Sequence, residues 1–294
     1  MRRSMLFLPG NAPKMIINGN YLGSDAVIFD LEDAVAPDQK DAARLLVRNV
    51  LRTIEFDRVE TIVRINSTDT GFWMKDIDAI LPQKPDIIML PKTSCAADVQ
   101  TVDAYLSAKE AELGMENNTV LLMPLIETAL GVENAFAIAS ASNRVTALFL
   151  GAEDLTADLR CKRTKEGREI DYARSRLVVA ARAAGVEVYD TPFTDVNDDE
   201  GIVADAAYAK SLGFTGKASI SPRHITAINT VFSPTKAEIA YAYEVIEAIE
   251  LAKQQGKGAI ALRGKMIDAP IVNRAKQTIA AAEALGIRKE DLAV

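Results

Sequence analysis

The sequence predicts a parallel (β/α)8 barrel, or TIM barrel, followed by a C-terminal extension of helices and a hairpin. Short apolar runs rich in Val, Ile, Leu, Phe and Ala alternate with segments of helical spacing, which is the pattern of βαβ units. There are eight such runs, at residues 4–10, 26–33, 61–66, 87–92, 120–127, 146–154, 186–193 and 217–222. Each is apolar almost throughout, as expected for parallel strands that are covered on both faces. No G-x-G-x-x-G turn occurs, which favours the closed barrel over a doubly wound open sheet.

Segments of helical spacing separate the runs. Clear examples lie at residues 38–51, 94–112 and 172–184. Gly185 and Gly213 follow two of the predicted helices and directly precede a strand, where a left-handed C-cap favours glycine. We therefore expect helical segments between consecutive strands.

The barrel is expected to occupy residues 1–232, and residues 233–294 exceed what a barrel needs. This tail predicts a helix at 234–255, a mobile hairpin and turn, and an alanine-rich helix that ends near Leu285. The hairpin and turn are indicated by Gly256, Gly258, Gly264, Asp268 and Pro270. Such a segment could act as a lid over an active site, and a plain surface extension is the alternative.

Composition excludes several classes of function. The chain has 34 lysines and arginines against 41 aspartates and glutamates, a net charge of −7, which argues against nucleic acid or anionic membrane as partners. No apolar stretch approaches the roughly 18 residues of a membrane span. Pro9 and Gly10 end the first apolar run early, so it predicts a strand and not a targeting segment. Cys95 and Cys161 lack the spacing of a disulfide framework or a metal site, and we expect a cytoplasmic protein.

The active site of such a barrel forms at the C-terminal ends of the strands. The polar residues there are Asp30, Glu32, Asp33, Arg64, Asn66, Lys92, Glu127, Glu153, Asp154, Asp190 and Ser221. Glu127 and Asp154 end neighbouring strands, so their carboxylates can converge on a divalent cation. Magnesium suits such oxygen ligands, and the lack of nearby histidine or cysteine argues against zinc. The alternative is that Asp154 only caps the next helix and Glu127 is a solvated end residue.

Three basic residues are further candidates. Arg64 presents a guanidinium that suits a carboxylate or an enolate oxygen, and a structural ion pair with Asp30 or Asp33 is the alternative. Lys92 could form a Schiff base with a carbonyl substrate or could simply pair with nearby acids. His224, the only histidine, could be a general base, but we favour an ordinary surface residue.

Several motifs together resemble the citrate lyase beta subunit family, within the wider HpcH/HpaI aldolase and malyl-CoA lyase superfamily. The motifs are RRSMLFLPGN, FDLEDAV, VRIN, MLPK, LIET, LGAEDL and GKMIDAP. The resemblance extends from Arg3 to about Leu285. It implies a homotrimer or hexamer of (β/α)8 barrels.

The resemblance also implies roles for individual residues. Mg2+ is held by the residues that match Glu127 and Asp154, and Arg64 matches the arginine that binds the keto-acid portion. Asp268 matches a tail aspartate that enters the neighbouring subunit's site, and residues 233–294 would then act as a lid there. Contacts to the thioester cofactor fall on Phe7, Lys14 and Asn18. Ser221, a further candidate for substrate binding, lies in Ile-Ser-Pro, where coenzyme-A-dependent relatives commonly have Ile-His-Pro.

The expected function is that of a magnesium-dependent lyase. It would cleave a citryl thioester, carried by acyl carrier protein or coenzyme A, to oxaloacetate and an acetyl thioester, in a complex with citrate lyase alpha and gamma subunits. Asp268 would protonate the enolate carbon, while Asp33, a metal-bound water or another acid would be the base. The alternatives are a malyl-CoA or citramalyl-CoA lyase that uses free coenzyme A, a Schiff-base aldolase that uses Lys92, and a non-catalytic assembly subunit.

Overall fold

The computed structural model describes residues 1–254 and 260–292, and the chain divides into two compact units. One unit is Arg2–Thr230 and the other comprises Val231–Val294 with Met1, so the division lies two residues before the one expected from the sequence. None of the described helices combines the length and the apolar character needed to cross a membrane.

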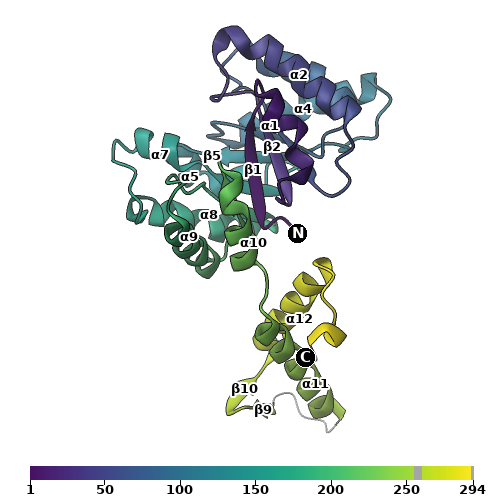
Figure 1. The fold of residues 1–294 in the computed structure, drawn as a ribbon, viewed down its shortest axis with the longest axis vertical. Coiled ribbons are helices and arrows are strands. Elements are labelled where there is room, and N and C mark those ends of the chain that lie inside the picture. Colours follow the sequence, from purple (N-terminus) through teal and green to yellow (C-terminus); the bar gives the residue numbers. More distant parts are fainter. Residues whose placement is uncertain (255–259, 293–294) are drawn as a thin grey trace. The chain divides into compact units, whose positions relative to one another are not determined.

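The first unit is a closed barrel of eight parallel strands, as predicted (Figure 1). The strands are β1 (Ser4–Pro9), β2 (Ala26–Asp30), β3 (Glu60–Arg64), β4 (Ile87–Leu90), β5 (Leu121–Ile126), β6 (Ala147–Leu150), β7 (Glu187–Asp190) and β8 (Gly216–Ser219). Each strand pairs with the next along the chain, and β8 pairs with β1 to close the barrel. Each of the eight apolar runs overlaps one strand, and β3 and β8 begin one residue before their runs.

Helices connect the strands. They are α1 (Pro13–Ile17), α2 (Lys40–Thr53), α3 (Trp73–Ile80), α4 (Ala96–Glu112), α5 (Ala129–Glu133), α6 (Ala135–Ala139), α7 (Ala152–Asp158), α8 (Asp171–Ala184) and α9 (Asp199–Leu212), and α10 (Ile225–Phe232) follows the last strand. The helices predicted at 38–51, 94–112 and 172–184 correspond to α2, α4 and α8. Gly185 and Gly213 form left-handed C-caps with φ of +75° and +109°, which confirms the expected helix ends.

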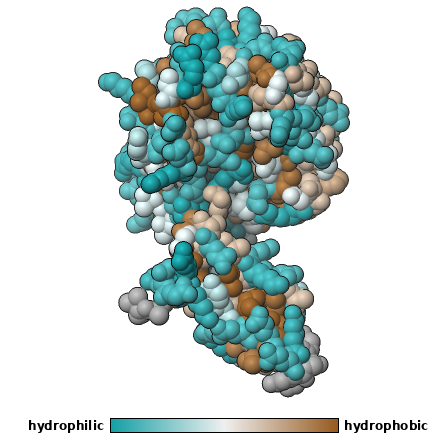
Figure 2. Space-filling view, turned by 90° about the vertical axis from the view of Figure 1, so that its right-hand side faces the viewer, coloured by the Kyte–Doolittle hydropathy of each residue, from teal (hydrophilic) through white to brown (hydrophobic). Residues whose placement is uncertain are grey.

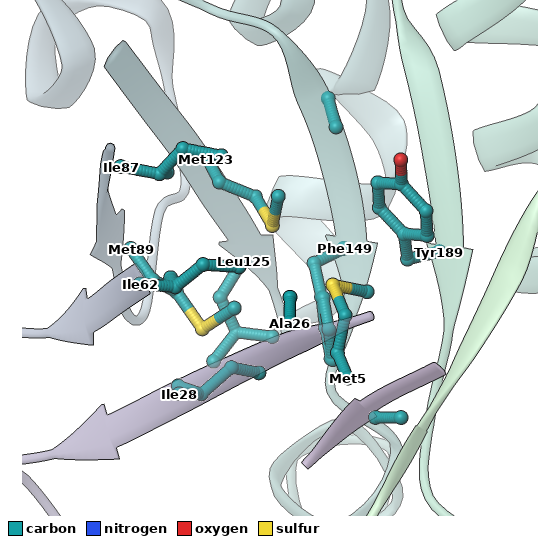
Figure 3. Close-up of a cluster of buried hydrophobic side chains, with 12 residues drawn as sticks. Met5, Ala26, Ile28, Ile62, Ile87, Met89, Met123, Leu125, Phe149 and Tyr189 are labelled. Carbon is teal, nitrogen blue, oxygen red and sulfur yellow. The ribbon is translucent and has the colours of Figure 1, made fainter. Parts of the chain in front are cut away.

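Side chains from all eight strands fill the interior of the barrel (Figure 3). The buried cluster contains Met5, Ala26, Ile28, Ile62, Ile87, Met89, Met123, Leu125, Ala147, Phe149, Tyr189 and Ala218. Successive side chains of a strand point to opposite faces, so a residue two positions after one of these also faces the barrel axis. This alternation determines which residues reach the open end of the barrel.

Asp190 illustrates the opposite face of the strands. It follows the inward-facing Tyr189, is fully buried, and accepts hydrogen bonds from Arg174 of α8 at 3.0 and 2.8 Å. Lys217 on β8 adds a third bond at 2.6 Å, and Arg174 also donates to Asp205 at 2.7 Å. Asp190 is therefore part of a buried ionic network between strands and helices, although the sequence placed it among the candidates at the barrel mouth.

The second unit is built on two helices and a short hairpin. The helices α11 (Lys236–Gln254) and α12 (Ala269–Ala284) pack together, and β9 (Ile260–Leu262) pairs with β10 (Lys265–Ile267). Gly264 lies in the turn of the hairpin with φ of +75°, whereas Gly256 and Gly258 lie outside the described residues. The core of this unit contains Ala242, Val245, Ile267 and Ala275.

On the visible face of the barrel unit, hydrophilic residues predominate and hydrophobic ones form small patches (Figure 2).

Replacing Arg174 with methionine should lower the free energy of unfolding by about 3–5 kcal/mol, because it removes the main partner of two buried carboxylates. Chemical denaturation measures the effect. Arg182→Met on the same helix is the control, since Arg182 is about half exposed, lies 3.5 Å from the half-exposed Glu187 and donates to the carbonyl of Gly213. A surface pair of this kind contributes about 0–1 kcal/mol. Equal destabilisation by the two substitutions would contradict the assigned role of the network.

Candidate active site

A cavity of about 340 Å³ opens at the C-terminal ends of the barrel strands. Its lining includes seven residues that the sequence named as candidates, which are Phe7, Asp30, Asp33, Arg64, Glu127, Glu153 and Asp154. Strand alternation explains this convergence, because Phe7, Arg64 and Glu127 each lie two positions after an inward-facing core residue. The layer of side chains next to the apolar core thus contains Arg64 and Glu127 beside Phe7.

Arg64 is held in place by two acids from β2 and the loop after it. Its Nε and Nη2 donate to the two carboxylate oxygens of Asp30 at 2.7 and 2.6 Å, and its Nη1 lies 3.1 Å from Glu32. The guanidinium also lies over the ring of Phe7, 5.2 Å from the centroid. Burial alone would raise the pKa of Asp30, but Arg64 holds it below its ordinary value. The structural ion pair between Arg64 and Asp30 is therefore present, and Arg64 lines the cavity as well.

Glu127 is almost fully buried, with 3% of its surface exposed, which excludes a solvated end residue. Its Oε1 accepts a hydrogen bond of 2.6 Å from the backbone amide of Lys92. Burial raises the pKa of Glu127 to about 8, against the effect of that hydrogen bond, and the negative charges of Glu32 and Asp154 add to the rise. A positive charge placed beside Glu127 would therefore be strongly favourable.

Asp154 lies in the first turn of α7, and the N-cap of that helix is Gly151. The interpretation of Asp154 as a helix cap is therefore wrong. Its Oδ2 is buried and has no hydrogen-bond partner within the described part of the chain. A side chain at Gly151 would come within 2.7 Å of Glu127 Oε2, so the glycine leaves room for the carboxylate.

These two carboxylates fit a divalent cation. Glu127 carries a strongly raised pKa, and Asp154 has a buried oxygen that lacks a donor. Among the residues that the structure describes, no three histidines, cysteines or acids form a metal cluster, so water or substrate oxygens would supply the other ligands. This matches the coordination habits of magnesium, which commonly keeps waters beside one or two carboxylates.

Lys92 and Asp33 lie at the edge of the same site. The ammonium group of Lys92 is 3.1 Å from Glu32 and 3.9 Å from Asp33. Although burial lowers the pKa of Lys92, its hydrogen bond to Glu32 and the neighbouring negative charges raise it above the ordinary value. The side chain of Asp33 is 56% exposed and lines the cavity, so it can exchange protons with solvent and with a bound ligand.

Four residues proposed for binding or catalysis lie outside this cavity lining. Asn18 is the C-cap of α1 and donates to the carbonyl of Lys14 at 2.8 Å. Lys14 is exposed on α1, where Met15 contributes to the lining instead. Ser221 accepts a hydrogen bond of 3.3 Å from the backbone of Arg223, while Ile220 lines the cavity. Asp268 belongs to the second unit, where it is the N-cap of α12 and accepts from the amide of Ile271 at 3.3 Å. Their proposed roles in binding and catalysis remain predictions.

His224 corrects the sequence interpretation. The sequence favours a surface residue, but the side chain is fully buried, beside the ring of Phe193 at a centroid distance of 6.2 Å. Burial lowers the pKa of His224 below its ordinary value. The apolar spacing of the helix that follows favours burial and was the signal available in the sequence.

Sequence reasoning underestimates two groups of residues. Asp30 and Glu32 stand out in the sequence only as members of a polar run, yet they hold Arg64 from two sides. Gly151 is not conspicuous in the sequence, although it is packed against Glu127. The sequence indicates this role only by the position of the glycine, which lies between an apolar strand and a helix with two acids in its first turn.

The barrel, the two acids Glu127 and Asp154 and the anchored arginine define a barrel enzyme with an acidic mouth whose carboxylates fit a cation. The family model described as HpcH/HpaI aldolase/citrate lyase matches residues 3–222. The chain belongs to this family.

Three known proteins illustrate the similarity. The citrate lyase subunit beta of Leuconostoc mesenteroides subsp. cremoris is 44% identical, with 97% of this chain and 94% of the relative covered. An L-malyl-CoA/beta-methylmalyl-CoA lyase of Cereibacter sphaeroides is 35% identical over 96% of this chain and 94% of its own. The crystal structure of the protein CitE from Mycobacterium tuberculosis, in complex with magnesium, acetoacetate and coenzyme A, is similar with a TM-score of 0.78. It is 30% identical, and the match covers 96% of this chain and 98% of that one.

The raised pKa of Glu127 predicts that stability depends on pH in the presence of EDTA. The folded protein keeps a proton on Glu127 up to about pH 8, whereas the unfolded chain releases it near its ordinary pKa. This contribution to stability is complete below the ordinary pKa and is lost as pH rises to about 8. Between about pH 6 and about pH 9 the loss should be about 3 kcal/mol. Urea unfolding measures it, and Glu127→Gln should remove it.

Glu187→Gln is the control for this experiment, because Glu187 is an exposed glutamate at the start of β7. It should keep the wild-type dependence on pH. Equal dependence in the wild type and Glu127→Gln would show that Glu127 ionises normally.

Proposed function

We propose that the protein is a magnesium-dependent carbon–carbon lyase that cleaves a citryl thioester to oxaloacetate and an acetyl thioester. The observation that carries this proposal is the pair of carboxylates, the buried Glu127 and the half-buried Asp154, in one cavity with the anchored Arg64. The similar citrate lyase beta subunit supports the reaction, and the magnesium and coenzyme A in the similar CitE structure support the cofactor and the class of substrate.

Glu127 and Asp154 would hold the magnesium ion, which would supply positive charge to lower the pKa of a substrate hydroxyl and to neutralise an adjacent carboxylate. Arg64 has five N–H donors, of which two donate to Asp30, while its Nη1 forms an ion pair with Glu32. Two remain for oxygens of the keto-acid portion of the substrate. Because Asp30 fixes the guanidinium beforehand, little reorganisation is needed when negative charge develops on those oxygens.

The bond changes follow from these positions. Asp33 is our candidate to accept the hydroxyl proton, since its exposed side chain lines the cavity. The carbonyl of oxaloacetate forms as the adjacent carbon–carbon bond breaks, and the electron pair of that bond enters the enolate of the acetyl thioester. An acid then protonates the enolate carbon, and Asp268 of a neighbouring subunit is our candidate.

The carrier and the assembly complete the proposal. The thioester is carried by an acyl carrier protein or by coenzyme A, and the protein works as a homo-oligomer with citrate lyase alpha and gamma subunits in the cytoplasm. Phe7 in the cavity lining, Lys14 on α1 and Ser221 after β8 are the proposed contacts for the substrate and its carrier. Cleavage of malyl-CoA or citramalyl-CoA is the second candidate, because a malyl-CoA lyase is 35% identical over nearly the whole chain.

A Schiff-base aldolase and a non-catalytic assembly subunit are less consistent with the site. A Schiff base requires a neutral lysine, but the acids around Lys92 raise its pKa and keep it charged. A purely structural subunit would not need a buried acid with a strongly raised pKa beside a second acid that has a buried oxygen without a donor.

The main test measures oxaloacetate release from citryl-CoA by the purified protein, with coupled malate dehydrogenase, in Mg2+ and in EDTA. We expect release that depends on Mg2+ and that falls by several orders of magnitude in Glu127→Ala and Asp154→Asn. Both variants should fold, which thermal unfolding checks. Glu187→Gln, at the opposite end of the barrel strands, should keep full activity.

The outcomes separate the candidates. Cleavage of malyl-CoA or citramalyl-CoA in place of citryl-CoA would establish the second candidate. Cleavage that persists in EDTA, together with trapping by borohydride, would establish the Schiff-base route. Wild-type activity in Glu127→Ala would refute the proposed metal site.

The role of Asp268 predicts complementation between subunits. Asp268→Asn keeps an oxygen that can cap α12 but removes the acid, so it should fold and lose most activity. Arg64→Ala should be inactive because its own cavity lacks the guanidinium. After the two variants are mixed, unfolded and refolded together, we expect partial activity, because an intact cavity can receive an intact aspartate from its neighbour.

Refolding each variant alone is the control and should yield no activity. If the mixture stays inactive although mixed oligomers form, Asp268 does not act across subunits.

A further inference from the structure

Lys92 has an unusual backbone conformation directly after β4. Its φ of +51° is left-handed, which a residue with a Cβ adopts only when its surroundings impose it. The next residue holds the turn from two sides. Thr93 donates through its backbone amide to the carbonyl of Leu125 at 3.2 Å, and through its hydroxyl to the carbonyl of Leu90 at 2.9 Å. The turn is thus fixed between β4 and β5.

The left-handed turn directs the amide of Lys92 at Glu127. The N–H donates to Oε1 at 2.6 Å, and the acceptor is a carboxylate with 3% of its residue surface exposed. The other oxygen, Oε2, lies beside Gly151, where a Cβ would be only 2.7 Å away. Contacts from the β4 side and the β6 side therefore fix the orientation of one buried carboxylate.

The side chain of Lys92 extends toward different partners. Its ammonium group lies 3.1 Å from Glu32, which in turn contacts Arg64 at 3.1 Å. One residue therefore connects the acids after β2 with the acid at the end of β5. Backbone and side chain act on separate groups, so their effects can be separated by substitution.

We propose that Lys92 is a positioning residue whose left-handed backbone presents the amide that orients Glu127 toward the magnesium ion. This inference rests on the proposed function, because it takes Glu127 as a ligand of Mg2+. It gives Lys92 a role through Glu127, distinct from Schiff-base chemistry.

The test compares variants that all remove the ammonium group and differ in the backbone they tolerate. Glycine and asparagine adopt the left-handed conformation readily, whereas β-branched valine does not. Mg2+ binding to each protein is measured by isothermal titration calorimetry without substrate. Lys92→Gly and Lys92→Asn should bind Mg2+ within about twofold of each other, and Lys92→Val should bind on the order of tenfold more weakly.

Lys84 is the matched control. It also has a left-handed backbone, with φ of +52°, but its amide donates to the carbonyl of Leu81. Lys84→Val should lower the melting temperature relative to Lys84→Gly and should leave Mg2+ affinity unchanged. If Lys92→Val does not fold, Lys92→Ala replaces it, with a smaller expected loss of affinity.

The outcomes are distinct. Equal Mg2+ affinity in the glycine, asparagine and valine variants overturns this inference and leaves the proposed function intact. A wild-type protein that binds no Mg2+ overturns both. Weak binding in all three variants would show that the ammonium group controls affinity, and the positioning role of the backbone would be wrong.

Discussion

The alternation of side chains along the strands of a closed barrel is the constraint on which the site depends. Met5, Ile28, Ile62 and Leu125 belong to the apolar interior, and the residues two positions further along reach the cavity. Because eight parallel strands end at one rim, these residues meet although they are distant in sequence. The packed apolar layer below also excludes water, and this explains why charges just above it interact so strongly.

The charges at the rim are only partly balanced by the protein itself. Arg64 and Lys92 pair with Asp30 and Glu32, so those two acids have cationic partners. Glu127 has a backbone amide, which favours one oxygen but does not cancel a charge. A buried carboxylate without a cationic partner either keeps a proton or binds a cation. The excess of negative charge at the rim is therefore a property of the fold, and a bound cation would neutralise it.

The sequence predicted the fold well because the barrel depends on patterns that are local. Apolar runs and the glycines Gly185 and Gly213 report their own secondary structure, and eight repeats leave few topologies. Convergence of Glu127 with Asp154 was also predictable, since neighbouring parallel strands end together. Burial of His224 and the outward direction of Asp190 were not, because each depends on which elements pack against one residue. The period of the apolar residues indicates on which face of a strand or helix a residue lies, but it does not indicate which other elements pack against that residue.

Lys92 shows why residue type and position do not fix a role. A lysine at the end of a barrel strand suggests a nucleophile, yet here the acids keep its ammonium charged and its amide makes the shortest contact. Its left-handed backbone costs about 1–2 kcal/mol, and the turn that imposes it is held by hydrogen bonds on both sides. A backbone conformation with this cost persists only when the surrounding structure imposes it, and such conformations are common at functional sites. The turn between β4 and β5 thus holds the amide of Lys92 against one oxygen of a buried carboxylate, Glu127.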